Sequence, residues 1–309
     1  MRVLLPYADR AEAEQRLAGL PAGVEVDCYR ADGDPWPAAL ADVELFVLPY
    51  LKSAEEVLGR VGEMTSLRVI QTLTAGVENF LPLVPDGVAL CNAAGVHDAS
   101  TAELALALAL ASGRRLDDYA RAQTSGRWAP QLGTSLADRR VLIVGYGRIG
   151  AAIERRLSGF EVASVARVAR RARSGDVEVQ PVTELHRMLR EADVVFVIAP
   201  LTAETAGLID AQALAALPDG ALLVNVARGR LVDTDALVAE TSSGRIRAAL
   251  DVTEPEPLPP DHPLWQVPGV LISPHVGGAS TAFFPRADRL VAAQLRRFAA
   301  GEELENRVR

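Results

Sequence analysis

The first 95 residues alternate short apolar runs with segments of helical periodicity. Strands are expected at Val3–Leu5, Val24–Asp27, Glu44–Leu48 and Arg68–Thr72, with a helix at Arg10–Leu17 and further helices between the later strands. Strands that alternate with helices in this way form parallel sheets covered by helices. The pattern therefore predicts an α/β unit at the start of the chain.

A second series of the same kind begins near Arg140. The expected strands are Val141–Val144, Val162–Val165, Val194–Ile198, Leu222–Val226, Ala248–Val252 and Val270–Ile272. The expected helices are Ile149–Leu157, Thr183–Arg190, Ala211–Leu217 and Asp235–Ser242. Several of these strands are continuously apolar, which is typical of a sheet covered on both faces. The sequence therefore predicts a second α/β unit.

Two helical segments define the expected boundaries between the units. Ser100 and Glu103 have the spacing of a capping box, which predicts a helix from Ser100 to about Ser112 that Gly113 ends. The amphipathic segment Arg286–Ala300 follows the last strand of the second unit and is expected to return to the first. We therefore expect two doubly wound parallel-sheet domains, one of residues 1–97 plus 282–309 and one of residues 98–281 inserted into it.

The composition is that of a folded protein without a basic surface. The 309 residues are 49% hydrophobic and carry a formal net charge of −8. A nucleic-acid surface would need a basic excess, so we expect no nucleic-acid partner. The most apolar stretch, Leu104–Ala111, is far shorter than the roughly 20 residues of a membrane span, so no membrane contact is expected. Cys28 and Cys91 lack metal-ligand spacing, which predicts no metal site and fits a cytoplasmic protein.

A glycine-rich turn joins the strand Val141–Val144 to the next predicted helix. Gly145, Gly147 and Gly150 form a G-x-G-x-x-G pattern. The first glycine permits a tight turn, the second lets the backbone approach a pyrophosphate, and the third allows close packing of helix on strand. We expect this loop, with Arg148 and Ile149, to bind a dinucleotide at the start of the helix.

The next strand indicates which dinucleotide is bound. An NAD site would have an acidic residue about 20 positions after the loop, to accept a hydrogen bond from the ribose 2′-hydroxyl. This chain has Arg167, Arg170, Arg171 and Arg173 there instead. Arginine suits a 2′-phosphate, so we expect NADP(H) to be favoured over NAD(H), chiefly because Arg167 is expected to end the strand. The alternative is a solvated basic loop.

Three charged groups follow three successive strands of the second unit. Arg228 comes after the strand Leu222–Val226, Glu254 and Glu256 after Ala248–Val252, and His275 after Val270–Ile272. Ligands of open α/β sheets bind outside the carboxyl ends of the strands. These side chains are therefore expected to face the part of the site where the nicotinamide lies.

These segments occur in the order of a known family. Gln71–Glu78 is similar to the substrate-binding loop of the D-isomer-specific 2-hydroxyacid dehydrogenases, Gly145–Gly150 to their cofactor loop, and Ala199–Thr205 to their Pro-Leu-Thr segment. The Arg-Gly, Glu-Pro and Pro-His signatures follow in the same order. The chain thus resembles this family over nearly its whole length. The resemblance implies a Rossmann-type cofactor domain inserted in a flavodoxin-like substrate domain.

The resemblance also implies roles for individual residues. Arg228 would hold the substrate carboxylate or carbonyl, for which its planar and permanently charged fork is suited. His275 would give a proton to the carbonyl oxygen, and Glu256 would pair with the histidine and orient it. The backbone N–H groups of Gly76 and Val77 would bind the substrate carboxylate.

The choice between two acids rests on a count along the sequence. The family's acid lies five residues after the aspartate of a Leu-Asp-Val segment, and counting from Asp251 selects Glu256 over its neighbour Glu254. Asp251 itself is expected to contact the carboxamide of the cofactor or to be a buried structural acid. Further cofactor contacts are expected at Pro200, Thr205, Val226, Ala227 and Gly277.

The expected activity is the reduction of a small 2-oxo acid, such as glyoxylate or hydroxypyruvate, to a D-2-hydroxy acid. Two alternatives stay open: a phosphite-type dehydrogenase, which has a similar Arg–Glu–His set, and a non-catalytic module that binds a dinucleotide and other proteins. The resemblance further implies a homodimer joined through the cofactor domain, to which the Ala- and Leu-rich segment Ser100–Ser112 could contribute.

Overall fold

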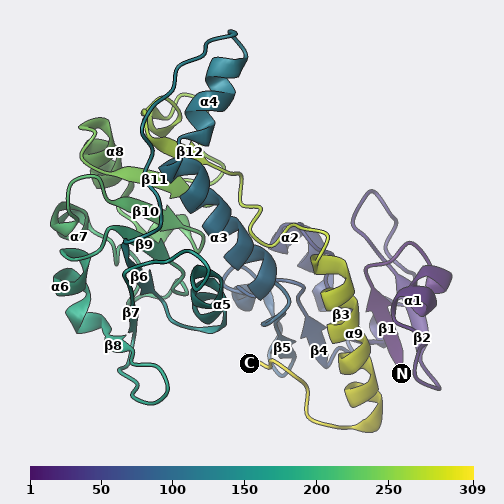
Figure 1. Cartoon of the computed structure of the whole chain (residues 1–309). Helices are drawn as coiled ribbons and strands as arrows, with labels where there is room; N and C mark the ends of the chain where they lie inside the picture. Colours follow the sequence, from purple (N-terminus) through teal and green to yellow (C-terminus); the bar gives the residue numbers. More distant parts are fainter. The chain divides into compact units, whose positions relative to one another are not determined.

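The computed structural model describes all 309 residues, and the chain divides into two compact units. One unit consists of Met1–His97 and Thr281–Arg309, and the other of Asp98–Ser280. Each is built on one parallel sheet, of five strands in the first and seven in the second (Figure 1). We call them the five-stranded unit and the seven-stranded unit.

The five-stranded unit has the strand order β2-β1-β3-β4-β5, which is the order of flavodoxin-like folds. Its strands are β1 (Arg2–Leu5), β2 (Glu25–Cys28), β3 (Val43–Val47), β4 (Val69–Gln71) and β5 (Ala89–Cys91). Its helices are α1 (Arg10–Arg16), α2 (Ala54–Leu58) and α9 (Phe283–Ala300). All of its strand pairs are parallel.

Helix α9, from the far end of the chain, packs on one face of this sheet. Phe283, Leu290 and Leu295 lie in the same core cluster as Val3 and Leu45. Neighbouring strand residues, such as Leu4 and Phe46, belong to a separate cluster. Successive side chains of a strand point to opposite faces, so the two clusters are the two covered faces of the sheet.

Two expectations for this unit need correction. We expected a helix between β2 and β3, but only a short 3-10 turn is found there, at Leu40–Asp42. Pro35 and Pro37 precede this turn, and proline disfavours helical backbone both at its own position and at the residue before it. Strand β5, at Ala89–Cys91, was not expected.

The seven-stranded unit has the strand order β12-β11-β10-β9-β6-β7-β8. Counted from β6, the first six strands have the Rossmann order 3-2-1-4-5-6, and β12 extends the sheet. The strands are β6 (Arg140–Val144), β7 (Ser164–Ala169), β8 (Gln180–Pro181), β9 (Val194–Val197), β10 (Leu222–Asn225), β11 (Arg247–Leu250) and β12 (Val270–Ile272). The predicted fold class is therefore confirmed.

The helices of this unit are α3 (Asp98–Gly113), α4 (Leu116–Gln123), α5 (Arg148–Leu157), α6 (Leu185–Leu189), α7 (Ala211–Ala216) and α8 (Thr234–Ser242). Helix α3 begins two residues before the expected capping box. Its Ser100 hydroxyl contacts the Ser280 hydroxyl at 2.7 Å and does not cap the helix. Asp98 lies in the first turn, where a negative charge interacts favourably with the helix dipole and stabilises the helix. None of the chain's helices combines the length and hydrophobicity that a bilayer crossing requires.

Candidate active site

The glycine-rich loop has the conformation that its three glycines predicted. Gly145 has a φ of 102°, and a Cβ atom there would collide with the backbone of Ala199. A Cβ at Gly150 would lie 2.9 Å from the Gly145 carbonyl oxygen, whereas nothing lies within 4 Å of a Cβ at Gly147. Gly145 and Gly150 therefore permit close packing, and Gly147 leaves open space for a ligand to approach the backbone.

Helix α5 begins at this open position. Gly147 is its N-cap residue and provides no side-chain cap, so the first-turn N–H groups at Arg148, Ile149 and Gly150 lack intrahelical acceptors. Together with the positive end of the helix dipole, such groups bind phosphate. The Arg148 side chain donates to Asp98 at 2.9 Å and is largely exposed. The loop thus fits the pyrophosphate of a dinucleotide.

Arg167 does not end its strand, which corrects one expectation. Strand β7 continues to Ala169, and the Arg167 guanidinium makes a two-point ion pair with Glu154 of α5, with an Nε–Oε2 distance of 2.7 Å. This pair lowers the pKa of Glu154 from its usual value. The Arg167 charge is therefore neutralised inside the unit. Successive residues of a strand face opposite sides of the sheet, and the sequence does not show which side of β7 faces α5. The Arg167–Glu154 pair therefore could not be predicted.

Arg170 is the first residue beyond β7, and its side chain is exposed. The equally exposed Arg171 follows it. Arg173 instead donates to the Tyr146 carbonyl oxygen within the glycine-rich loop, and its guanidinium lies 5.8 Å from the centre of the Tyr146 ring. Of the four arginines, Arg167 is the one paired with a carboxylate, Arg173 is held by a carbonyl oxygen of the glycine-rich loop, and Arg170 and Arg171 are exposed just beyond the carboxyl end of β7.

The loops after β9 and β10 complete this part of the edge. Ala199 packs against Gly145, and the next residue, Pro200, accepts a hydrogen bond from the Thr205 hydroxyl at 2.6 Å. The same hydroxyl accepts from the Thr202 N–H, so Thr205 holds its loop in a compact turn. Val226 and Ala227, which follow β10, are buried.

Arg228 lies three residues beyond β10 in a loop fixed on both sides. The buried Asn225 side chain donates to the Arg228 carbonyl oxygen at 2.9 Å and accepts from the Ala227 N–H at 3.1 Å. A Cβ atom on Gly229 would collide with the backbone of Thr253, so only glycine lets this loop pack against the loop that follows β11. The Arg228 Nη1 donates to the Ala227 carbonyl oxygen at 2.7 Å. Asn225 and Gly229 therefore fix the backbone from which the Arg228 side chain extends.

Asp251, directly after β11, organises the loop that carries His275. Its buried carboxylate accepts from the Ser273 hydroxyl at 2.6 Å and from the N–H groups of Val276 and Gly277 at 2.9 and 2.8 Å. A Cβ on Gly277 would lie 2.9 Å from this carboxylate. Asp251 is thus a buried acid whose carboxylate holds the loop that carries His275, and its contact with the cofactor carboxamide stays a prediction.

His275 and Glu256 form a pair at this edge. The His275 Nδ1 lies 2.5 Å from the Glu256 Oε1, and both side chains are partly exposed. His275 has a φ of 52°, and its N–H donates to the Asp251 carbonyl oxygen at 2.8 Å. Glu254 contributes its backbone carbonyl to a hydrogen bond from Thr234 and does not contact His275. Of the two candidate acids, Glu256 is the one that meets the histidine.

Gly76 and Val77 lie in the five-stranded unit, in the loop after β4. The carbonyl oxygens of this loop are occupied: Asn92 donates to that of Ala75 at 2.8 Å, and the Thr74 hydroxyl to that of Gly76 at 2.7 Å. The N–H groups of Gly76 and Val77 make no hydrogen bond to another residue. Hydrogen bonds to its carbonyl oxygens thus fix the loop, while the N–H groups of Gly76 and Val77 remain as donors, which an anion site requires.

Two supporting residues were missed from the sequence, Asn225 and Ser273, and Gly229 was used only as part of the Arg-Gly signature. A polar residue ending an apolar strand could have indicated Asn225. Ser273 lies two residues before His275, but its partner Asp251 is 22 positions away, and no sequence spacing links the two. With these residues, the edge offers a phosphate-binding turn, a fixed arginine and a histidine–carboxylate pair, which together are suited to proton-coupled reduction of a bound carbonyl.

Comparisons with known proteins point to one family. The NAD-binding domain profile of the D-isomer specific 2-hydroxyacid dehydrogenases matches residues 106–277, which cover most of the seven-stranded unit and contain every site residue described in it.

Individual relatives agree with this match. A glyoxylate reductase of Korarchaeum cryptofilum is 35% identical over 247 residues, which are 76% of this chain and 74% of that enzyme. A glyoxylate reductase/hydroxypyruvate reductase of Mus musculus is 36% identical over 228 residues, 70% of this chain and 69% of that protein. A D-isomer specific 2-hydroxyacid dehydrogenase of Xanthobacter autotrophicus Py2, solved with NADPH and MES, superposes with a TM-score of 0.82 at 29% identity, covering 100% of this chain and 98% of that one.

Proposed function

Because the chain belongs to the D-isomer specific 2-hydroxyacid dehydrogenases and is an NAD(P)-dependent oxidoreductase, we propose that it reduces glyoxylate to the achiral glycolate or hydroxypyruvate to the D-2-hydroxy acid, with NADPH as the preferred cofactor. The observation that carries this proposal is the His275–Glu256 pair at the carboxyl edge of the cofactor-binding sheet. The names of the relatives support small 2-oxo acids as the substrate class.

The pair supports a specific proton path. Glu256 occupies the Nδ1 side of the imidazole, which leaves Nε2 as the nitrogen that can face a substrate. Nε2 gives its proton to the carbonyl oxygen of the oxo acid, and the Glu256 carboxylate stabilises the ring while it is charged. The bound nicotinamide supplies the hydride that reaches the carbonyl carbon. Proton and hydride together convert the carbonyl group into a hydroxyl group.

Two groups of donors are proposed to orient the substrate. The Arg228 guanidinium binds the carboxylate and polarises the carbonyl, because its charge is permanent and its loop is fixed. The N–H groups of Gly76 and Val77 bind the carboxylate as hydrogen-bond donors. A small oxo acid has few other groups to hold, so these contacts determine which face of the carbonyl receives the hydride.

The proposed preference for NADPH rests on Arg170 and Arg171. Both are exposed immediately beyond β7, where an NAD site would have an acidic residue. Arg167, which we expected to lead this interaction, is engaged by Glu154. The 2′-phosphate is therefore assigned to Arg170, with support from Arg171.

A substrate panel tests the proposal directly. The purified chain is mixed with glyoxylate, hydroxypyruvate, pyruvate, phenylpyruvate and, in the reverse direction with NADP⁺, phosphite. We expect the highest kcat/KM with glyoxylate or hydroxypyruvate, and higher values with NADPH than with NADH. Turnover of phosphite alone would replace the proposal with a phosphite dehydrogenase. NADPH binding without turnover of any oxo acid would favour a non-catalytic binding module.

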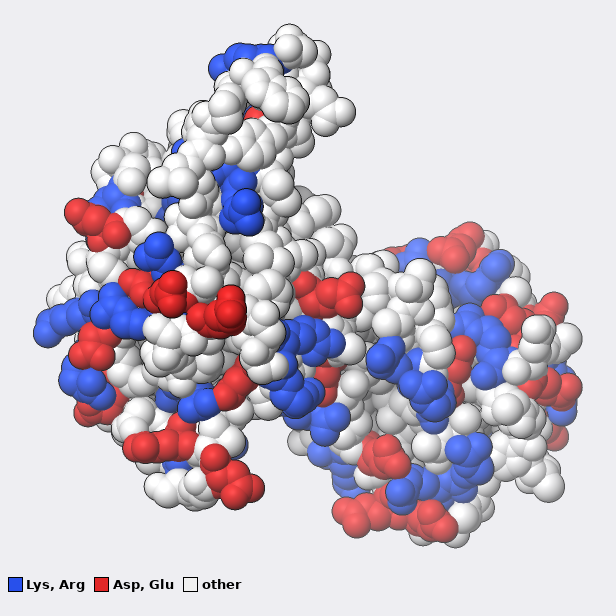
Figure 2. All heavy atoms as spheres, viewed as in Figure 1, with Lys and Arg blue, Asp and Glu red and all other residues white.

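We also propose a homodimer. Residues 114–134, which we call the arm, contain α4 and the segment that returns to β6, and they project from the seven-stranded unit (Figure 1). Trp128 on the arm is 95% exposed, and the arm surface visible in Figure 2 is mostly uncharged apart from basic side chains at its tip, while acidic and basic side chains are interspersed over most of the remaining face. Large exposed apolar side chains of this kind mark contact surfaces. If sedimentation analysis of the purified chain at micromolar concentration showed only monomer, the proposed dimer would be contradicted.

A further inference from the structure

A pocket of about 310 Å³ lies at the edge of the seven-stranded sheet opposite to the site described above. Gly220 precedes β10, Ile246 precedes β11, Arg247 begins β11, and Gly269 precedes β12, so these residues line the pocket at the amino ends of the strands. The strands are parallel, which places Arg228, Glu256 and His275 at the other ends. The pocket is therefore separate from the candidate active site.

Two arginines line this pocket, Arg115 and Arg247. Arg115 donates through Nε to Asp118 at 2.9 Å, and its Nη2 lies 2.7 Å from the same oxygen. Arg247 donates through Nε and Nη2 to the Ser112 hydroxyl and carbonyl oxygens, at 3.3 and 2.9 Å. Neither Nη1 group has a hydrogen-bond partner in the chain, so each guanidinium keeps donors for a ligand.

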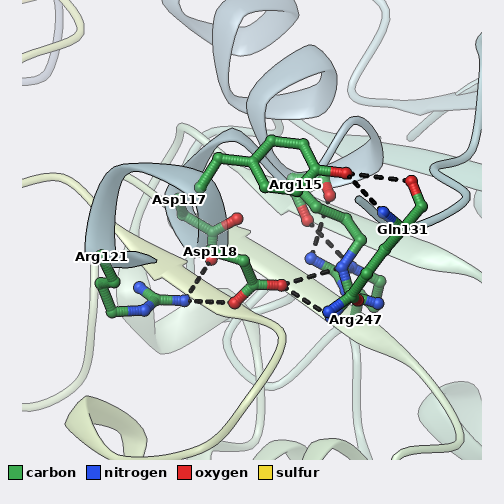
Figure 3. A network of polar contacts seen from close by, with 8 residues as sticks. Arg115, Asp117, Asp118, Arg121, Gln131 and Arg247 are labelled. Atoms are coloured by element: carbon green, nitrogen blue, oxygen red, sulfur yellow. Dashed lines mark hydrogen bonds and ion pairs between the residues drawn. The ribbon is translucent and has the colours of Figure 1, made fainter. Parts of the chain in front are cut away.

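The charge around the pocket is unbalanced. Asp118 is the only acid in its lining, and its second oxygen accepts from Arg121 at 2.7 Å. Figure 3 shows Asp118 between Arg121 on one side and Arg115 on the other, with Arg247 also on the Arg115 side. Asp118 is thus shared by Arg115 and Arg121, and Arg121 also donates to Asp117 at 2.8 Å, while Arg247 has only the neutral Ser112 as a partner. The lining carries a net positive charge.

The backbone around Arg115 is fixed where the arm begins. Arg115 has a φ of 57°, a left-handed conformation that costs a non-glycine residue about 1–2 kcal/mol. The Thr134 N–H donates to the Gly113 carbonyl oxygen at 2.7 Å, and a Cβ on Gly133 would lie 2.9 Å from that oxygen. The two ends of the arm are therefore clamped together, and the Arg115 guanidinium is preorganised at the pocket.

We propose that this pocket binds a small phosphate-bearing anion. Arginine forks match the geometry and charge of phosphate, and two partly paired guanidinium groups leave donors for different oxygens of one group. A volume of about 310 Å³ admits a phosphate with a short carbon chain but not a dinucleotide. The ligand class is therefore inorganic phosphate or a small phosphate ester, bound at a site distinct from the cofactor loop.

Isothermal titration calorimetry tests this site in the holoprotein. Saturating NADP⁺ is present throughout, so that the turn Gly145–Gly150 is filled, and chloride holds the ionic strength constant. The probes are inorganic phosphate, glycerol 1-phosphate and citrate. We expect the two phosphate probes to bind and citrate to bind more weakly. Tighter binding of glycerol 1-phosphate than of phosphate identifies an ester as the ligand, and the reverse order identifies free phosphate.

The variants Arg115→Gln and Arg247→Gln are each expected to weaken phosphate binding about tenfold or more, because a hydrogen bond to a charged group contributes about 1.5–3 kcal/mol. Arg114→Gln is the matched control: it removes the same charge from the adjacent exposed position, which does not line the pocket. Its affinity for phosphate should equal that of the unmodified chain. Thermal melting establishes that each variant is folded, and if Arg247→Gln unfolds, Arg115→Gln decides.

Three results would overturn the site. The first is the absence of any heat of binding with either phosphate probe at probe concentrations up to about 10 mM, which corresponds to a binding free energy near 3 kcal/mol. The second is a phosphate affinity that is the same in both pocket variants as in the unmodified chain. The third is a loss of phosphate affinity in Arg114→Gln that equals the loss in the pocket variants. Preference for citrate over both phosphate probes would also contradict recognition of a phosphate group. All of these outcomes are independent of whether an oxo acid is reduced.

Discussion

At the carboxyl edge of the seven-stranded sheet, ionisable side chains contact one another and fix the loops that carry them. His275 contacts Glu256, and the buried Asp251 carboxylate accepts a hydrogen bond from the Val276 N–H in the loop that carries His275. At the carboxyl edge of the five-stranded sheet, the loop after β4 presents backbone N–H groups instead, fixed through the carbonyl oxygens of Ala75 and Gly76. Both edges have the same parallel α/β frame. The difference implies that the first edge is sensitive to side-chain chemistry and the second to backbone geometry.

The largest effect is expected from His275→Asn, which removes the proposed proton donor. Asparagine tolerates the left-handed backbone that His275 adopts, so the loop should keep its shape. General acid catalysis contributes about 10²–10⁴-fold, and kcat should fall by that factor while NADPH affinity is retained. His262→Asn is the control, because His262 only caps a short turn and asparagine caps equally well. Retention of full activity in His275→Asn would remove the proposed proton path.

Glu256→Gln and Glu254→Gln separate two acids that lie two residues apart. Only Glu256 contacts His275, and loss of a charged hydrogen-bond partner worth about 1.5–3 kcal/mol should lower kcat/KM by about 10- to 100-fold. The Glu254 side chain makes no such contact, so Glu254→Gln should leave kcat/KM unchanged. Steady-state rates with glyoxylate measure both. The opposite ranking would transfer the role to Glu254.

How far the sequence predicts such details depends on the range of the interaction. Arg228, Glu256 and His275 follow apolar strands, and strand order alone brings strand ends to one edge. To predict the Arg167–Glu154 pair, one would need to know where β7 ends and which side of the strand faces α5, and an apolar pattern defines neither. The bonds of Asp251 to a loop more than 20 residues away depend on the folded backbone itself.

Arg170→Gln tests the reassignment of the cofactor contact from Arg167. Loss of one charged hydrogen bond to the 2′-phosphate should raise the KM for NADPH about tenfold and leave that for NADH unchanged. Arg167→Gln should leave the ratio of the two values unaltered, because Glu154 already occupies Arg167. Initial rates with each cofactor at saturating oxo acid measure the ratio. A shift in Arg167→Gln alone would restore the expectation drawn from the sequence.

The smallest effect is expected in the five-stranded unit, from Thr74→Val. This change keeps the shape of the side chain and removes the hydrogen bond to the Gly76 carbonyl oxygen, so the N–H groups of Gly76 and Val77 lose part of their fixed orientation. A neutral hydrogen bond contributes about 0.5–1.5 kcal/mol, which predicts a rise of about 2- to 10-fold in the KM for the oxo acid and little change in kcat. Thr65→Val is the control, since it removes an exposed hydroxyl that donates to the Ala41 carbonyl oxygen in the same unit. If kcat fell and KM did not, the loop would act on the chemical step, and backbone geometry at this edge could no longer be assigned to substrate binding alone.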